Sequence, residues 1–109
     1  MSYSIKTIPK FDKQLKKLIK KYPSFKIEFT NFIASLHEDP NQGTPLGNNC
    51  YKIRLSIASK GKGKSGGARL ITNFIISEST IYLISIYDKS EKENLSEKEL
   101  IELLKYLPY

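Results

Sequence analysis

The sequence predicts an α+β fold, in which two N-terminal helices pack on a small antiparallel β-sheet and a further helix lies at the C-terminus. Apolar residues with helical spacing dominate the first 37 residues, and apolar runs typical of strands dominate residues 51–87. A short amphipathic segment follows. Because 109 residues are enough to bury one hydrophobic core without disulfides or metal ions, we expect residues 1–109 to form a single domain.

A short strand and two helices are expected in the first third of the chain. Residues 3–8 alternate as a strand does, and Pro9 ends that strand. Apolar residues at helical spacing, with lysines between them, then predict an amphipathic helix with a basic outer face that ends near Tyr22. A second apolar stripe predicts a helix capped by Ser24. Because only a couple of residues join the two helices, we expect them to be antiparallel.

A loop, three strands and a final helix account for the rest. Residues 38–49 are rich in turn-forming residues and predict a loop. The expected strands cover residues 51–57, 70–76 and 81–87. Ser96 and Glu99 have the spacing of a capping box, which predicts a helix that ends before Pro108. The predicted order is therefore βααβββα.

The segment Lys60–Arg69, KGKGKSGGAR, concentrates positive charge between two of these strands. The chain has a formal net charge of +7, and residues 50–76 contain lysine and arginine but no acid. Four cations within ten residues cannot be buried without acidic partners, so the segment must face water or a polyanion. The charge pattern favours a nucleic acid or an acidic protein as partner, although solubility alone also explains it.

The composition argues against several other classes of protein. Cys50 is the only cysteine, so we expect a reduced thiol, with neither an intramolecular disulfide nor a thiolate zinc site. No apolar run is long enough to span a membrane, and residues 1–10 lack the apolar core of a signal peptide. We therefore expect a cytoplasmic protein with no membrane partner. His37 falls at a helix C-terminus, where a favourable interaction with the helix dipole explains it.

Two segments resemble the RelE/ParE superfamily of bacterial type II toxins, and within it the HigB-like branch. They are GKGKSGGARL at 61–70 and IYLISIYDKSEKENLS at 81–96, and the resemblance covers nearly the whole chain. It implies a small antiparallel sheet flanked by helices and a HigA-like or RelB-like antitoxin as partner. It also implies cleavage of mRNA in the A site of the 70S ribosome, with no cofactor and no metal.

Cleavage of RNA through its 2′-hydroxyl needs removal of the 2′-proton, stabilisation of phosphoryl charge and protonation of the leaving 5′-oxygen. The resemblance implies that Arg69 contacts the scissile phosphate and that Lys89 is the basic residue after the last strand. The expected catalytic residues are Arg69, Lys89, Glu91 and Lys92. The expected RNA-binding residues are Lys52, Arg54, Lys60, Lys62 and Lys64.

The sequence does not identify the residues that act as general base and general acid. The base could be Asp88, Glu91 or a lysine whose pKa is lowered by neighbouring lysines. The candidate lysines are Lys60, Lys62, Lys64, Lys89 and Lys92. The C-terminal catalytic tyrosine of RelE falls at Leu95 here, and the sequence does not select a replacement. The candidates are Tyr87, Tyr106 and Tyr109. Two other functions remain: a ParE-like DNA gyrase poison and a non-toxic nucleic-acid-binding module on the same fold.

Overall fold

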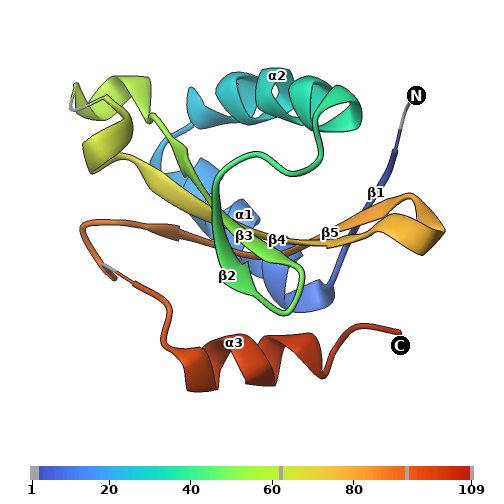
Figure 1. Cartoon of the computed structure of the whole chain (residues 1–109). Helices are drawn as coiled ribbons and strands as arrows, with labels where there is room; N and C mark the ends of the chain where they lie inside the picture. The colour runs from blue at the N-terminus through green and yellow to red at the C-terminus, as the bar shows by residue number, and fades with distance from the viewer. Residues whose placement is uncertain (1–2, 62, 93, 109) are drawn as a thin grey trace.

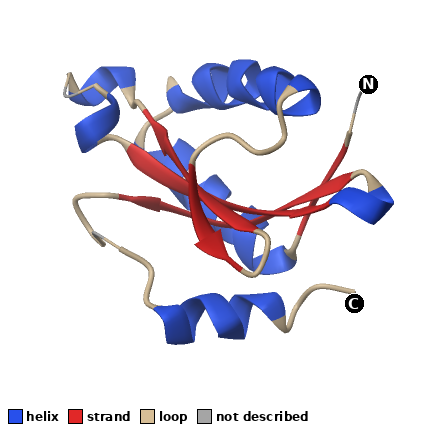
Figure 2. Ribbon diagram, viewed as in Figure 1, coloured by secondary structure: helices blue, strands red, loops and turns tan. Residues whose placement is uncertain are grey.

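The computed structural model describes residues 3–61, 63–92 and 94–108. Its elements, in chain order, are β1 (Ser4–Thr7), α1 (Pro9–Lys21), α2 (Phe25–Glu38), β2 (Thr44–Gly47), β3 (Cys50–Leu55), β4 (Ala68–Ile75), β5 (Thr80–Asp88) and α3 (Glu97–Leu104). Short 3-10 turns lie at Ala58–Lys60, Lys64–Gly66 and Ile76–Glu78. Figure 1 labels these elements, and Figure 2 distinguishes helices from strands. The α+β class and all the predicted helices and strands are confirmed.

The five strands form one mixed sheet in the order β1-β5-β4-β3-β2. Strands β2 to β5 pair antiparallel, as expected, but β1 pairs parallel to β5. The expectation of a wholly antiparallel sheet is therefore wrong at this edge. Alternation of apolar residues identifies a strand but carries no information on its direction, and more than 70 residues separate β1 from its partner.

The predicted loop at 38–49 contains an additional strand, β2, which pairs with the start of β3. Asn48 and Asn49 form the connecting turn, and both have positive φ angles, of 55° and 62°. Two adjacent asparagines in the left-handed region are typical of the tight turn of a β-hairpin. The prediction missed β2 because Pro45 and Gly47 mask a strand only four residues long.

Helix α1 continues along the sheet edge on which β1 lies. Strand β1 ends opposite Leu83, which leaves the rest of that β5 edge without a strand partner. Gln14 of α1 takes this place, since its side-chain carbonyl accepts hydrogen bonds from the Ile86 backbone amide at 3.1 Å and from the Ser85 hydroxyl at 3.2 Å. The C-terminus of α1 therefore lies beside the C-terminal end of β5.

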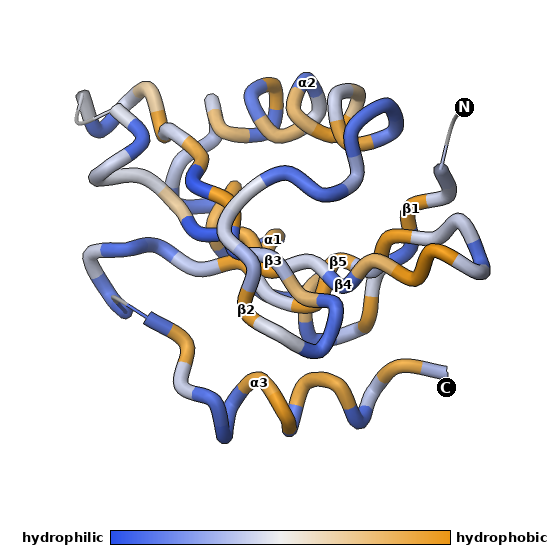
Figure 3. The backbone as a smooth tube through the Cα atoms, viewed as in Figure 1, coloured by the Kyte–Doolittle hydropathy of each residue, from blue (hydrophilic) through white to orange (hydrophobic). Residues whose placement is uncertain are grey.

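The two sides of the sheet are covered by different helices. In Figure 1, α2 lies on one side and α3 on the other. Phe11 of α1 packs near Phe29 of α2, with ring centroids 6.1 Å apart, so the predicted helix pair is in contact. The central strands β4 and β5 are buried along almost their whole length. Figure 3, which is coloured by hydropathy, shows hydrophobic residues along both strands. No helix in the described ranges is long and apolar enough to cross a membrane.

The two predicted helix caps differ in outcome. Ser96 accepts a hydrogen bond from the Glu99 amide at 3.1 Å, and Glu99 accepts one from the Ser96 amide, so the capping box is confirmed. Ser24 occupies the N-cap position of α2 but makes no capping hydrogen bond. Its backbone is already helical, whereas an extended backbone normally turns a capping side chain towards the first free amides.

Candidate functional site

One face of the sheet carries a group of polar side chains that we call the cationic face: Lys52, Arg54, Arg69 and Tyr87. Arg69 lies directly opposite Arg54 on one side and Tyr87 on the other, so these three side chains point to the same face. Lys52 is two residues before Arg54 and shares its direction. Among the described residues, no acidic side chain forms an ion pair with these three cations. The polar contact of Lys52 is with the neutral side chain of Asn94, at 3.1 Å.

Arg69 is buried and holds the chain segment that precedes β4. Its guanidinium donates hydrogen bonds to the carbonyl oxygens of Lys64 at 2.9 Å, Ser65 at 3.1 Å and Ala68 at 3.1 Å. Burial and the neighbouring charge of Arg54 both lower the pKa of Arg69. Two adjacent guanidiniums without a carboxylate would gain from a bound anion, which would offset their mutual repulsion.

Asp88, at the end of β5, joins three parts of the chain. Its carboxylate, which is 1% exposed, accepts hydrogen bonds from Lys60 at 2.7 Å, from Tyr22 at 3.0 Å and from the amide and hydroxyl of Ser90 at 2.9 and 2.8 Å. Burial raises the pKa of Asp88, but these hydrogen bonds outweigh burial and hold that pKa well below its usual value. A carboxylate with these partners is a poor general base, which argues against that role for Asp88.

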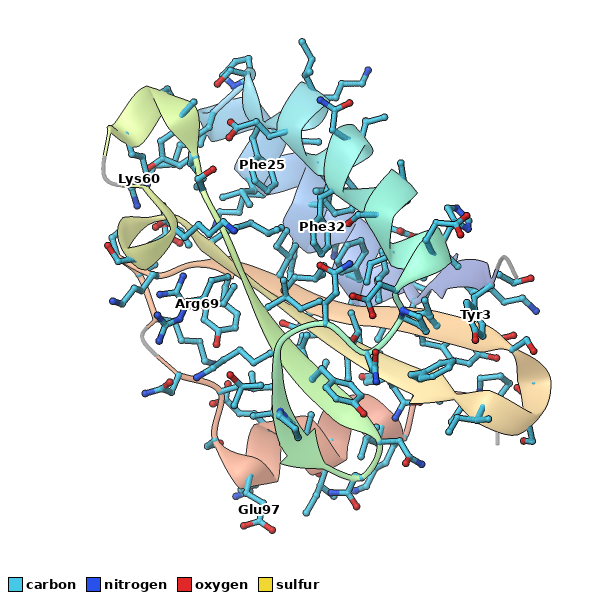
Figure 4. All side chains as sticks on the ribbon, turned by 45° about the horizontal axis from the view of Figure 1, so that its top comes forward. Tyr3, Phe25, Phe32, Lys60, Arg69 and Glu97 are labelled. Atoms are coloured by element: carbon cyan, nitrogen blue, oxygen red, sulfur yellow. The ribbon has the colours of Figure 1, made fainter. Side chains whose placement is uncertain are left out.

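The segment that contains the glycines and lysines is anchored at both ends; we call residues 58–67 the glycine-lysine loop. Glu28 of α2 accepts hydrogen bonds from the Ala58 amide at 3.0 Å and the Ser56 hydroxyl at 3.3 Å. At the other end, the Gly67 carbonyl accepts a hydrogen bond from the Lys89 amide at 3.0 Å. Figure 4 shows Lys60 and Arg69 at the same end of the molecule. The loop is therefore held in place by α2, β4 and the segment after β5.

The predicted lysines of this loop differ in their surroundings. Lys60 is engaged with Asp88, and its side chain is only 11% exposed. Lys64 is exposed and lines a groove of about 690 Å³, together with Lys52 and Arg54. Lys62 lies outside the described residues. The groove side of the loop therefore presents Lys64 rather than Lys60.

The segment after β5 brings the other predicted site residues to different neighbours. Glu91 is exposed and forms an ion pair with Lys21 of α1 at 3.0 Å. Lys92 forms an ion pair with Glu99 of α3. Lys89 is half-buried, and its backbone amide bonds to Gly67. The Lys89 backbone thus lies beside Gly67, two residues before Arg69, whereas Glu91 and Lys92 contact the flanking helices.

Tyr87 is the tyrosine that the structure brings to the cationic face. Tyr87 as a whole is 9% exposed, and its hydroxyl forms no hydrogen bond with any of the described residues. It lines a cavity of about 270 Å³ with Leu95 and Leu103. Burial raises the pKa of Tyr87, and the neighbouring charge of Arg69 opposes this only in part, so the phenol stays protonated at neutral pH. Tyr106 is 62% exposed beyond α3, and Tyr109 lies outside the described residues.

Sequence reasoning missed two residues that shape the site. Tyr22 was used only to mark the end of the first helix, yet its hydroxyl donates a hydrogen bond to Asp88. Glu28 was not singled out, although it holds the start of the glycine-lysine loop. The available signal for Glu28 was an acid in the first turn of the second helix, in a chain whose residues 50–76 contain no acid. Within the described parts of the chain, no group of three or more His, Cys, Asp or Glu side chains could hold a metal ion.

Replacement of Gly67 by alanine is expected to destabilise the protein by about 3 kcal/mol. A methyl group at this position would overlap the Leu55 carbonyl oxygen of the neighbouring strand. Gly61→Ala is the matched control, because space around Gly61 is open and only its positive φ of 67° adds strain, costing about 1 kcal/mol. Urea denaturation of both variants measures the difference. Equal stability of the two would contradict the close packing at Gly67.

The fold and the cationic face define a small basic α+β protein with an anion-attracting sheet surface. The family model described as "RelE toxin of RelE / RelB toxin-antitoxin system" matches residues 13–107, so the chain belongs to the RelE toxin family. It is a type II toxin of the RelE superfamily, the toxin component of a toxin-antitoxin system. The superfamily resemblance predicted from the sequence is confirmed, whereas the HigB-like branch stays a prediction.

Solved structures share this fold at low sequence identity. A double mutant of E. coli toxin RelE in the free state is 20% identical, with a TM-score of 0.62 over 96% of this chain and 97% of that chain. The same mutant toxin in complex with an antitoxin RelBc peptide is 19% identical, with a TM-score of 0.62 over 98% and 99%. A chain of the intact E. coli RelBE toxin-antitoxin complex is 20% identical, with a TM-score of 0.59 over 80% of this chain and 96% of that chain.

Proposed function

We propose that this toxin is a ribosome-dependent mRNA endonuclease that cleaves mRNA in the A site and so inhibits translation in the cytoplasm. The observation that carries the proposal is the pair of neighbouring arginines, Arg54 and Arg69, on a sheet face whose cations form no ion pair with an acid in the described parts of the chain. Fixed guanidiniums stabilise the extra negative charge that develops on phosphoryl oxygens during RNA cleavage. Family membership supports the same reading. In this proposal residues 1–109 act as one domain.

The residues around the arginine pair have separate roles in the proposal. Lys52, Arg54 and Lys64 bind the RNA backbone along the groove that they line. Lys62, in the same loop as Lys64, is a further candidate for RNA binding. Lys60 supports binding indirectly, because its ion pair with Asp88 fixes the glycine-lysine loop. Lys89, Glu91 and Lys92 stay candidates for the transfer of the 2′-proton, since they follow Tyr87 on the turn after β5.

Tyr87→Phe is expected to lower the cleavage rate by about 100-fold with little change in RNA binding, because the phenol is proposed to protonate the leaving 5′-oxygen. Among the residues that the structure describes, none forms a hydrogen bond with this hydroxyl that its removal would break, so the fold should be retained. Single-turnover cleavage on programmed ribosomes measures the rate. The control is Tyr106→Phe, which changes an exposed ring and should leave the rate unaltered. A Tyr87→Phe rate equal to the control rate would exclude Tyr87 as the proton donor.

The proposed function is tested by incubating the purified toxin with programmed ribosomes and mapping the mRNA ends by primer extension. We expect cuts within the A-site codon, and no cuts in the same mRNA without ribosomes. Intact mRNA in cells arrested by the toxin would overturn the proposal. Inhibited gyrase supercoiling with translation unaffected would instead establish a gyrase poison. Salt-dependent RNA binding without any toxicity would establish a non-toxic binding module.

A cognate antitoxin, HigA-like or RelB-like, is expected to neutralise the toxin. The RelBE complex and the RelE complex with an antitoxin peptide are the structural relatives that support this expectation. Since the cationic face has no acidic partner within the described residues, an antitoxin segment that carries carboxylates would complement it. Co-expression with the neighbouring gene should restore growth, and the two proteins should then co-purify.

A further inference from the structure

Residues 85–87 of β5 follow an irregularity in the sheet. In the described chain, β1 pairs with β5 only as far as Leu83, so the rest of that edge has no strand partner. On the opposite edge, the register with β4 shifts so that Ile84 is an extra residue. An extra residue of this kind stays unpaired, disrupts the ladder locally and re-aims the side chains beside it. Other contacts must therefore fix the backbone that leads to Tyr87.

Gln14 of α1 supplies such a contact from the open edge of β5. Its side-chain carbonyl oxygen accepts hydrogen bonds from the Ile86 amide at 3.1 Å and from the Ser85 hydroxyl at 3.2 Å. Gln14 is half-buried, and both it and Tyr87 line the cavity of about 270 Å³ and a second hollow of about 170 Å³. One glutamine thus anchors the two residues before Tyr87 and lies close to Tyr87 itself.

Tyr87 depends on its backbone more than Arg69 does. Arg69 lies opposite Tyr87 on β4, and its guanidinium is fixed by three carbonyl oxygens. The Tyr87 hydroxyl forms no hydrogen bond with any described residue, so packing and the backbone of β5 determine where the ring lies. A proton donor must come within about 3 Å of its acceptor, so a small displacement of the ring lowers the rate of proton transfer.

We propose that Gln14 is a positioning residue for mRNA cleavage, which holds β5 so that the Tyr87 hydroxyl and the Arg69 guanidinium are presented to the same phosphate group. The inference rests on the proposed ribonuclease function, in which Tyr87 is the proton donor. Gln14 acts through its hydrogen bonds to Ser85 and Ile86 and does not contact the reacting atoms. Loss of these bonds should therefore slow the chemical step and leave ribosome binding unchanged.

The test compares two substitutions of similar length at position 14. Gln14→Met removes the accepting oxygen, whereas Gln14→Glu keeps an oxygen that can accept the same hydrogen bonds. Single-turnover cleavage is measured over a range of concentrations of programmed ribosomes. Gln14→Met should cut about tenfold more slowly at saturation, with an unchanged half-saturating ribosome concentration, and Gln14→Glu should stay within about threefold of wild type. The control is Asn31→Met, which replaces an exposed side-chain amide on α2 and should leave the rate unaltered.

A double-variant cycle separates positioning from general destabilisation. If Gln14 acts through Tyr87, Gln14→Met should have little further effect in the Tyr87→Phe background, because the group that it positions is already absent. A further loss of about tenfold in that background would show an independent effect and overturn the inference. Wild-type cleavage by Gln14→Met, failure of Gln14→Glu to restore the rate, or a change confined to the half-saturating concentration would overturn it too.

Hydrogen exchange of the Ile86 amide gives a readout that requires no cleavage. Gln14→Met should raise the exchange rate of this amide by about tenfold, whereas Gln14→Glu and Asn31→Met should leave it near the wild-type rate. An unchanged exchange rate in Gln14→Met would overturn the inference while wild-type cleavage, and with it the proposed function, still stood. Absence of any mRNA cutting by wild type would instead overturn the proposed function and the catalytic role of Gln14 together.

Discussion

Arg69→Ala is expected to lower the rate of mRNA cleavage by about 100- to 1000-fold, the loss typical of removing one charged donor from a preorganised site. Two effects combine at this position. The variant removes one of two adjacent guanidiniums, and it frees the carbonyl oxygens of Lys64 and Ser65, which fix the end of the glycine-lysine loop. Single-turnover cleavage on programmed ribosomes measures the rate, and circular dichroism checks that the sheet is retained.

Arg69→Lys separates charge from geometry. Lysine keeps the positive charge but has no planar fork with which to reach two loop carbonyls together. If geometry matters, this variant should also lose at least about tenfold in rate, because a single ammonium cannot reproduce the bonds to both carbonyls. Full activity in Arg69→Lys would show that charge alone suffices. Wild-type activity in Arg69→Ala would remove Arg69 from the site altogether.

Asp88→Asn is expected to lower the free energy of unfolding by about 3 kcal/mol, because it leaves the buried Lys60 ammonium without its counter-charge. The glycine-lysine loop should then detach from β5, and cleavage should fall together with stability. Urea denaturation at neutral pH measures the change. The control is Glu102→Gln, which breaks an exposed pair with Lys105 and should have little effect. Equal stability of both variants would contradict the structural role of Asp88.

The same carboxylate predicts a direction for the dependence of stability on pH. Because its hydrogen bonds hold the pKa of Asp88 below that of an unfolded aspartate, the unfolded state takes up this proton first on acidification. The contribution of Asp88 should be fully present above about pH 4, the ordinary range for this side chain, and should decline as the pH falls below it. Asp88→Asn should abolish this part of the acid sensitivity. An unchanged acid profile in the variant would show that other carboxylates control it.

Local patterns predicted the fold well where each element carries its own signal. The lysine-rich first helix, the capping box at Ser96 and the apolar strand β5 all follow from spacing alone. The direction of β1 could not be predicted, because it depends on a partner strand distant in sequence. The position of β2 could not be predicted either, because it depends on a turn of two asparagines. Residues close in sequence encode helices and caps, whereas the sheet order is a property of the whole chain.

The candidate site was predicted in composition but not in arrangement. Arg54 and Arg69 were both singled out, yet their direct opposition across two strands required the register. Lys60 was predicted to be available for RNA binding. The sequence gives no sign that its ammonium group would form an ion pair with Asp88, 28 residues later. The roles of Tyr87 and Glu28 likewise depend on tertiary contacts: Tyr87 lines a cavity beside α3, and Glu28 connects a helix to a loop.

The parallel pairing of β1 with β5 has a consequence for the order of synthesis. Residues 4–7 leave the ribosome before their partners, residues 80–83, so this edge strand cannot pair until the segment between them has been synthesised. Tyr87 and the carboxylate that positions the glycine-lysine loop come later still. Contacts between such distant segments form late in folding. Incomplete chains that end before β5 therefore lack Tyr87 and Asp88, and toxicity should arise only once β5 has been synthesised.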